Sequence, residues 1–181
     1  YFKEVFKQKY KDSSKLDSNI AIIEETAKQL ENEISTGKDI IIVDRCINDR
    51  QIWNYIRYKK NDIDTKRYEE LKTKYRDISK KLIDVLVITY ADPIISLKRD
   101  YNSSLALEKR TFLNVENINE YNESVKDLHD LFESSVNNLI LVDTSNINMN
   151  DLSIKIAYEI MNVMRSKYIE SFKKKYNLEG E

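Results

Sequence analysis

Apolar residues recur along this chain with two different periods. Between residues 17 and 37 they lie three or four positions apart, which is the spacing of one face of an amphipathic helix. This face comprises Ile20, Ile23, Ala27, Leu30 and Ile34. Gly37 suits the end of such a helix. Further helices are predicted over about 1–10, 48–60, 65–82, 93–101, 118–132 and 151–167.

Three short runs are instead apolar throughout, within Asp39–Asp44, 84–90 and 138–143. A strand without polar alternation is usually buried on both faces, as in a parallel sheet. Helices alternate with these runs, which points to βαβ units. We therefore expect an α/β fold, a three-layer parallel sheet with helices on both faces, in a single domain over 1–181. The tail, 168–181, is either helical or frayed.

Three strands are few for a parallel sheet, and the chain starts at Tyr1 rather than at a methionine. Both features lead us to expect that these residues belong to a longer protein with additional strands upstream of Tyr1.

Composition limits the partners and the cellular compartment that we expect for this protein. The 30 Lys and Arg residues balance 31 Asp and Glu residues, so no global basic field indicates a nucleic-acid partner. Cys46 is the one cysteine, which excludes an internal disulfide framework and a multi-thiolate metal site. No segment approaches the roughly 20 apolar residues of a membrane span, and no signal-peptide pattern is visible. These features favour a cytoplasmic protein without membrane contact.

The first apolar run ends in Asp44-Arg45, and Asp49 follows about one helical turn later. An apolar strand closing in aspartate has the shape of a Walker B element, whose carboxylate reaches Mg²⁺ on nucleotide phosphates. Asp143 matches that pattern equally well, and the alternative for both is an aspartate that caps the next helix. Because Arg45 is costly to bury without an anion, we expect it to pair with Asp49 or to hold a substrate phosphate or hydroxyl.

A second group of cations follows the strand at 84–90. Lys98 and Arg99 lie one helix length beyond it, and Lys109 and Arg110 lie across a polar loop. On a segment that moves over the sheet edge, these cations would form a lid that delivers positive charge to a transferring phosphoryl group. The alternative is an ordinary solvated surface with acidic neighbours.

Three other side chains are weaker candidates for a site. Trp53 either belongs to the core or lines a pocket beside the end of the Asp44 strand. His129 is interpreted as a surface or boundary residue, and Cys46 as a packing residue, because one remote histidine does not make a nucleophile pair.

In their order and spacing, these motifs resemble the nucleoside and nucleotide kinases of the P-loop superfamily, in particular the deoxynucleoside kinase and thymidylate kinase group. Asp44-Arg45 stands where that family has its DR or ER signature. DVLVITYADPIISLKRD resembles the segment in which a strand leads through a turn to a helix ending in arginine. LEKRTFLNVENINEYNESV resembles the lid and the helix after it, and LILVDTS the last strand with its adenine-side loop. The resemblance covers about residues 17–165.

The resemblance implies ATP- and Mg²⁺-dependent phosphoryl transfer to a small nucleoside- or nucleotide-like acceptor. Asp44 would bind Mg²⁺ or activate the acceptor hydroxyl, Arg45 would hold the acceptor, and Asp49 would lie near the acceptor pocket. The residues implied at the donor phosphates and at adenine are Arg99, Lys109, Arg110, Thr144 and Ser145.

The family's Gly-rich phosphate loop, GxxxxGK[ST], is absent from these residues. Either that loop lies upstream of Tyr1, or the chain is a non-catalytic α/β interaction module for a protein or nucleic-acid partner. For the second alternative, residues 57–81 carry ten Lys or Arg against five Asp or Glu. A P-loop NTPase without a small-molecule acceptor is a third alternative, and homodimer formation stays open.

Overall fold

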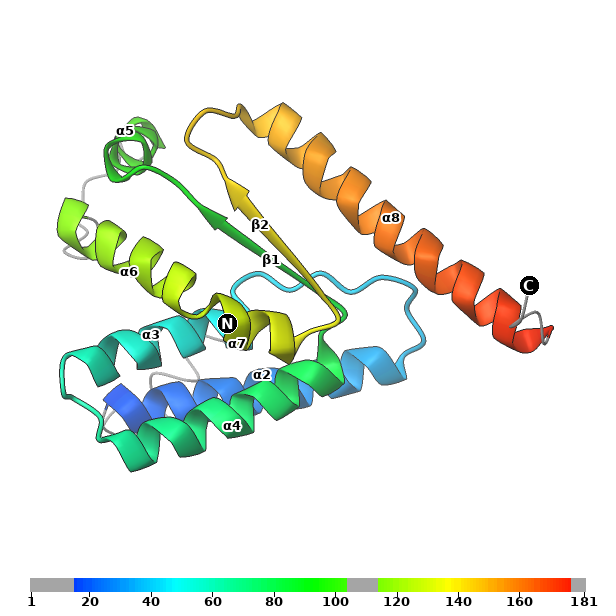
Figure 1. The fold of residues 1–181 in the computed structure, drawn as a ribbon, viewed down its shortest axis with the longest axis horizontal. Coiled ribbons are helices and arrows are strands. Elements are labelled where there is room, and N and C mark those ends of the chain that lie inside the picture. Colours follow the sequence, from blue (N-terminus) through cyan, green and yellow to red (C-terminus); the bar gives the residue numbers. More distant parts are fainter. Residues whose placement is uncertain (1–14, 104–113, 177–181) are drawn as a thin grey trace. The chain divides into compact units, whose positions relative to one another are not determined.

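The computed structural model describes residues 15–103 and 114–176, which fall into two compact units (Figure 1). Unit 1 consists of the described residues up to Ile83 together with Glu123–Ser135. Unit 2 consists of the described parts of Asp84–Asn122 and of the chain from Val136 onward. The described residues are mostly helical and hold one sheet of two strands.

The expected three-layer parallel sheet is therefore wrong for the described part of the chain. The predicted strand at Asp39–Asp44 does not form, and the segment joins helix α2 (Lys15–Ser35) to helix α3 (Ile47–Lys59) without a ladder. Ile42 in this segment is 89% exposed. The reason is that a strand exists only beside another strand, so an apolar run alone does not supply its pairing partner.

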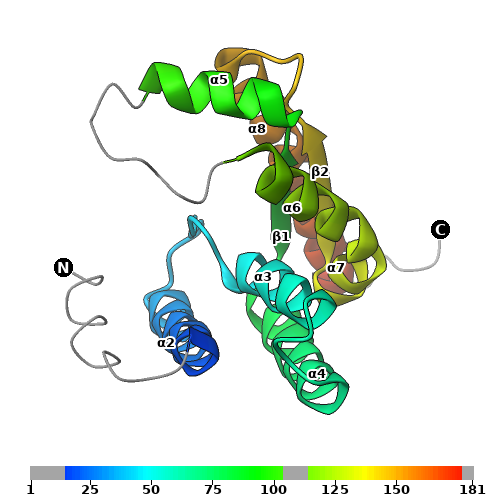
Figure 2. The same ribbon diagram turned by 90° about the vertical axis from the view of Figure 1, so that its left-hand side faces the viewer.

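Unit 1 is built from helices packed on one another. Its elements are α2, α3, α4 (Thr65–Leu82), the end of α6 (Val115–Asp127) and α7 (His129–Ser135). Figure 2 shows α3 beside α4, with α2 next to them. Their core consists of Ile23, Leu30, Ile47, Leu71 and Tyr75. The caps follow the sequence: the Asp64 carboxylate accepts the Arg67 N–H at 2.9 Å, and Gly37 has the positive φ of 73° that glycine adopts readily after a helix.

The helix predicted over 118–132 is interrupted in the structure. Helix α6 ends at Asp127 and α7 begins at His129, so Leu128 lies between them. The Leu128 N–H still donates to the Ser124 carbonyl at 3.1 Å, and the Phe132 N–H donates to the Leu128 carbonyl at 3.0 Å. The break is therefore local and the apolar face continues across it.

Unit 2 is organised by two parallel strands. Strand β1 (Val85–Tyr90) pairs with β2 (Asn138–Asp143) in a register that runs from Val85 opposite Asn138 to Tyr90 opposite Asp143. Both strands were predicted, and their parallel pairing is confirmed. Helix α5 (Pro93–Ser103) follows β1, and the Asp92 carboxylate accepts the Ile94 N–H at 2.8 Å at its start.

Helix α8 (Met149–Lys175) is longer than the predicted 151–167. The part of the tail up to Lys175 is thus helical. Figure 1 shows that α8 begins beside the carboxyl ends of the strands and diverges from them toward its own end. Leu152 is buried, whereas every residue from Met164 to Tyr176 is exposed. No helix in the described ranges has the length and apolar character needed to cross a membrane.

Candidate functional site

Arg99 connects α5 to the loop that follows β2. Its Nη1 donates to Thr144 Oγ1 at 3.1 Å, and its Nη2 donates to the carbonyl oxygens of Thr144 at 2.6 Å and Ile147 at 3.3 Å. These three acceptors are neutral. The guanidinium charge is therefore held at the carboxyl edge of the strand pair without being neutralised by the atoms that position it.

The loop residues at this edge are hydrogen-bonded to one another. Ser145 Oγ accepts the Asp92 N–H at 2.8 Å and donates to Asp143 Oδ1 at 2.6 Å. Thr144 Oγ1 donates to the Tyr90 carbonyl at 3.1 Å, and the Thr144 N–H donates to the same oxygen at 2.8 Å. The loops after β1 and β2 are thus joined directly by these contacts.

The structure brings together part of the site expected from the sequence. Arg99 and Thr144 were both expected at the donor nucleotide, and they are in direct contact in unit 2, with Ser145 following in the same loop. Lys109 and Arg110, the expected lid cations, lie outside the described residues.

Asp44 and Arg45 lie in unit 1, on the connecting segment between α2 and α3, and both are exposed. The argument that Arg45 is buried at a strand end therefore does not hold, because neither the strand nor the burial is present. Arg45 has a φ of 57°, in the left-handed region that costs a non-glycine residue about 1–2 kcal/mol. The exposed Asp44 carboxylate offers oxygen ligands of the kind that Mg²⁺ prefers.

Asp49 and Trp53 are half-buried on α3. The Asp49 N–H donates to the Cys46 carbonyl at 3.1 Å, within the first turn of the helix. Burial raises the pKa of the Cys46 thiol, and a hydrogen bond with the Ile47 backbone lowers it in part. A thiol kept protonated by burial fits the packing role expected for Cys46.

A group of neutral polar residues buried between α3 and α4 was missed from the sequence. Asn48, Gln51 and Asn54 are each at most 3% exposed, and Ser79 is fully buried. The Asn48 Nδ2 donates to Gln51 Oε1 at 3.0 Å, and Ser79 Oγ donates to Asn48 Oδ1 at 3.4 Å. The sequence signal was their spacing of three along a helix, which places them on one side of it.

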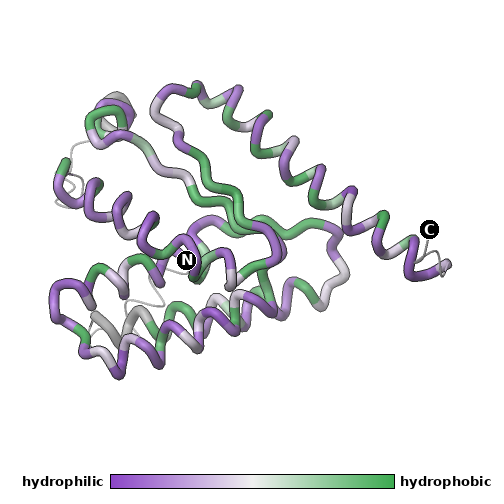
Figure 3. Tube along the Cα trace, viewed as in Figure 1, coloured by the Kyte–Doolittle hydropathy of each residue, from purple (hydrophilic) through white to green (hydrophobic). Residues whose placement is uncertain are grey.

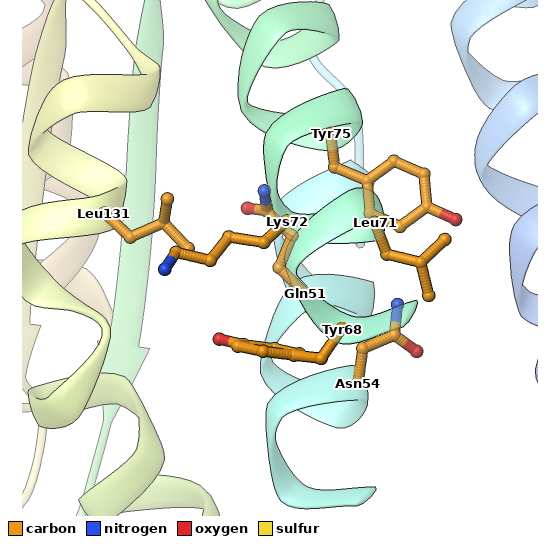
Figure 4. Close-up of a pocket in the computed structure, with 7 residues that line it drawn as sticks. All are labelled: Gln51, Asn54, Tyr68, Leu71, Lys72, Tyr75 and Leu131. Carbon is orange, nitrogen blue, oxygen red and sulfur yellow. The ribbon is translucent and has the colours of Figure 1, made fainter. Parts of the chain in front are cut away.

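This polar group borders a small pocket within unit 1, with about 210 Å³ of empty space including its open mouth. Figure 4 shows the side chains that line it, namely Gln51, Asn54, Tyr68, Leu71, Lys72, Tyr75 and Leu131. Gln51 Nε2, both amide atoms of Asn54 and the Tyr75 hydroxyl have no hydrogen-bond partner among the described residues. Three of the residues that line the pocket therefore carry buried polar atoms without a hydrogen-bond partner among the described residues.

His129, Asp130 and Glu133 at the start of α7 offer one nitrogen and two carboxylate oxygens within 4.8 Å of one another. This donor set suits a divalent cation. Both acidic side chains are exposed, and such groups commonly approach each other on a helix surface without an ion, so we assign no metal to them.

No model of a known protein family matches this chain, and no curated protein matches it.

Proposed function

We propose that this protein is a cytoplasmic phosphotransferase that moves a phosphoryl group from ATP, with Mg²⁺, to a small nucleoside- or nucleotide-like acceptor. The observation that carries the proposal is the Arg99 guanidinium at the carboxyl edge of β1 and β2. Open parallel sheets bind their ligands at this edge. Among the described residues, the contacts of Arg99 occupy three of its five N–H donors, and all three go to neutral oxygens.

Phosphoryl transfer depends on positioning and on neutralising charge, since the protein does little covalent chemistry. Arg99 would contact the donor phosphates, and the loop at Thr144-Ser145 would lie against the base. Mg²⁺ would neutralise phosphate charge when bound. The 181 residues contain no Gly-rich phosphate loop. They therefore supply positive charge to the phosphates but not the backbone N–H groups of such a loop.

The test is a calorimetric titration with ATP and Mg²⁺, together with a phosphoryl-transfer assay, on this chain and on the intact natural protein. Arg99→Met keeps the side-chain stem and removes the charge, and we expect it to weaken ATP binding at least about 10-fold. Lys155→Met, on the exposed surface of α8, is the matched control and should bind ATP like the wild type. Absence of ATP binding by the intact protein, or equal binding by Arg99→Met, would contradict the proposal.

A non-catalytic interaction module is the second candidate, and the exposed apolar residues of α8 favour it. Its nucleic-acid form is less favoured, because basic residues of α4 form ion pairs with acidic residues of unit 1. Examples are Arg67 with Glu70 at 3.3 Å and Lys74 with Glu24 at 2.5 Å. Transfer to an acceptor supports the kinase, and turnover of ATP without an acceptor supports an NTPase. If the intact protein shows neither activity, the result supports the interaction module.

A further inference from the structure

Helix α8 carries a stripe of large apolar residues, interrupted by one arginine, on its exposed side. The stripe consists of Ile154, Tyr158, Met161, Arg165, Tyr168 and Phe172, spaced alternately four and three residues apart. Its apolar members are between 46% and 72% exposed. Met164 and Ile169, each 42% exposed, flank it. We call this stripe the α8 outer face, and Figure 3 shows apolar residues recurring along the whole helix.

The opposite side of the same helix is also apolar and is partly buried. Leu152 is buried, and Ile156 and Val163 are half-buried, whereas the outer face lies about 180° away around the helix axis. A helix that is apolar on two sides is expected to be covered on both. The alternation of four and three residues is the heptad spacing with which one helix packs against another.

We propose that the α8 outer face pairs with the same face of a second copy of this chain, with the two helices antiparallel. The charges on α8 argue for this occupant and this orientation. Residues 149–162 carry one basic and two acidic side chains, whereas 163–176 carry five basic and one acidic side chain. An antiparallel pair places the basic half of each helix beside the acidic half of the other. A parallel pair would place the two basic halves side by side.

The pairing register follows from the heptad positions. Antiparallel packing sets the first apolar position of one heptad opposite the second of its partner. A register centred between Met161 and Arg165 places Ile154 opposite Phe172 of the partner subunit and Met161 opposite Arg165 of the partner subunit. This register covers the whole outer face and sets the basic half of each helix beside the acidic half of the other. In a parallel pair, Arg165 would instead face its own copy.

The contact area is sufficient for a specific interface. Covering about half of the exposed surface of these large side chains on both copies would bury on the order of 1,000 Å² in total, the lower range for a specific protein–protein contact. Self-association through this face does not depend on phosphoryl transfer, so the two proposals fail independently.

The first test is the mass of the full chain in solution, measured by sedimentation equilibrium over a range of concentrations. We expect a dimer for the wild type, and Met161→Lys should weaken the dimer by about 100-fold, because it places a second cation opposite Arg165 of the partner subunit at the centre of the face. Ser166→Lys, exposed but off the outer face, is the matched control and should stay dimeric. A monomeric wild type, or a Met161→Lys dimer of unchanged affinity, would overturn the proposal.

The second test fixes the orientation by disulfide formation in a Cys46→Ala background. Antiparallel pairing predicts that the double variant Ile154→Cys/Phe172→Cys crosslinks two chains, whereas Phe172→Cys alone does not, because its two copies lie about 27 Å apart along the helix axes. Efficient crosslinking by Phe172→Cys alone would overturn the antiparallel arrangement.

Discussion

Buried polar side chains differ in hydrogen bonding between two regions of the molecule, the carboxyl edge of β1–β2 in unit 2 and the α3–α4 interior in unit 1. At the edge, the Thr144 hydroxyl, 7% exposed as a residue, both donates to a backbone carbonyl and accepts from Arg99. In the interior, Asn54 is 2% exposed and neither its oxygen nor its nitrogen has a partner among the described residues. Two buried polar groups therefore differ in their effect on stability, because one is hydrogen-bonded and the other is not.

The cause is the backbone around each group. Where strands end, carbonyl and N–H groups leave the ladder, and nearby side chains can bond to them. Inside two packed helices the backbone groups already bond to one another, so a buried amide must find another side chain. Asn48 does so through Gln51 and Ser79, but Asn54 does not. Polar side chains at the edge therefore stabilise the fold while they form a binding surface, whereas Asn54 costs stability.

The tyrosines of the unit 1 interior should make the stability of the fold strongly dependent on alkaline pH. Burial raises the pKa of Tyr75 and of Tyr68 above the ordinary value of 10.0, and the nearby carboxylates of Glu24 and Glu69, respectively, raise them further. The folded chain thus keeps these protons at a pH where the unfolded chain loses them. We expect the free energy of unfolding to be insensitive to both groups below pH 10 and to fall above it, by up to about 1.4 kcal/mol per pH unit for each tyrosine.

The measurement is urea unfolding followed by circular dichroism across this pH range. Tyr75→Phe removes one of the two titrating groups and should flatten the decline by about one tyrosine's share. Below pH 10 the curves of Tyr75→Phe and of the wild type should run parallel, which separates the effect of the proton from that of the lost hydroxyl. If the free energy of unfolding of Tyr75→Phe falls with pH as steeply as that of the wild type, Tyr75 does not cause the decline.

A smaller effect is expected at the carboxyl edge. Thr144→Val keeps the shape of the side chain but removes the hydroxyl. The Tyr90 carbonyl oxygen then loses one of its hydrogen-bond donors, and Arg99 Nη1 loses its acceptor. We expect a loss of about 1–2 kcal/mol in the free energy of unfolding. Thr144→Ser retains the hydroxyl and should lose less. If the double variant Arg99→Met/Thr144→Val loses the full sum of the single losses, the two side chains are not coupled.

The sequence predictions succeeded where signals within one segment determine the structure of that segment. Helix α4 and strand β2 have the predicted bounds, because Asp64 caps the helix and the strand is apolar throughout. Arg99 and Thr144 were expected at one site only from the family resemblance, and they are in contact because parallel strands bring the segments that follow them to one edge. Local signals were sufficient for α4 and β2.

The predictions failed where partners decide the structure. Ile40–Val43 has the composition of a central strand, yet strand formation requires a neighbour that no local pattern specifies. The buried amides Asn48, Gln51 and Asn54 were missed because isolated amides are typical of surfaces. Only their regular spacing of three, on a helix that also carries buried isoleucines, distinguishes them.

Two buried asparagines of helix α3, Asn54 and Asn48, differ in hydrogen bonding and should respond differently to the same substitution. Asn54→Leu replaces an amide without partners by an apolar group of similar size, so we expect the free energy of unfolding to rise by about 1 kcal/mol. Asn48→Leu is the matched control, since it makes the same change at an equally buried position whose amide is hydrogen-bonded, and it should destabilise the protein by about 1–3 kcal/mol. Thermal unfolding of the two variants beside the wild type measures both changes. Opposite signs mean that hydrogen-bond partners, rather than burial, decide the cost of a polar side chain between α3 and α4. A loss in Asn54→Leu as large as that in Asn48→Leu would show instead that the shape of the amide, or a bound molecule in the pocket, holds this position.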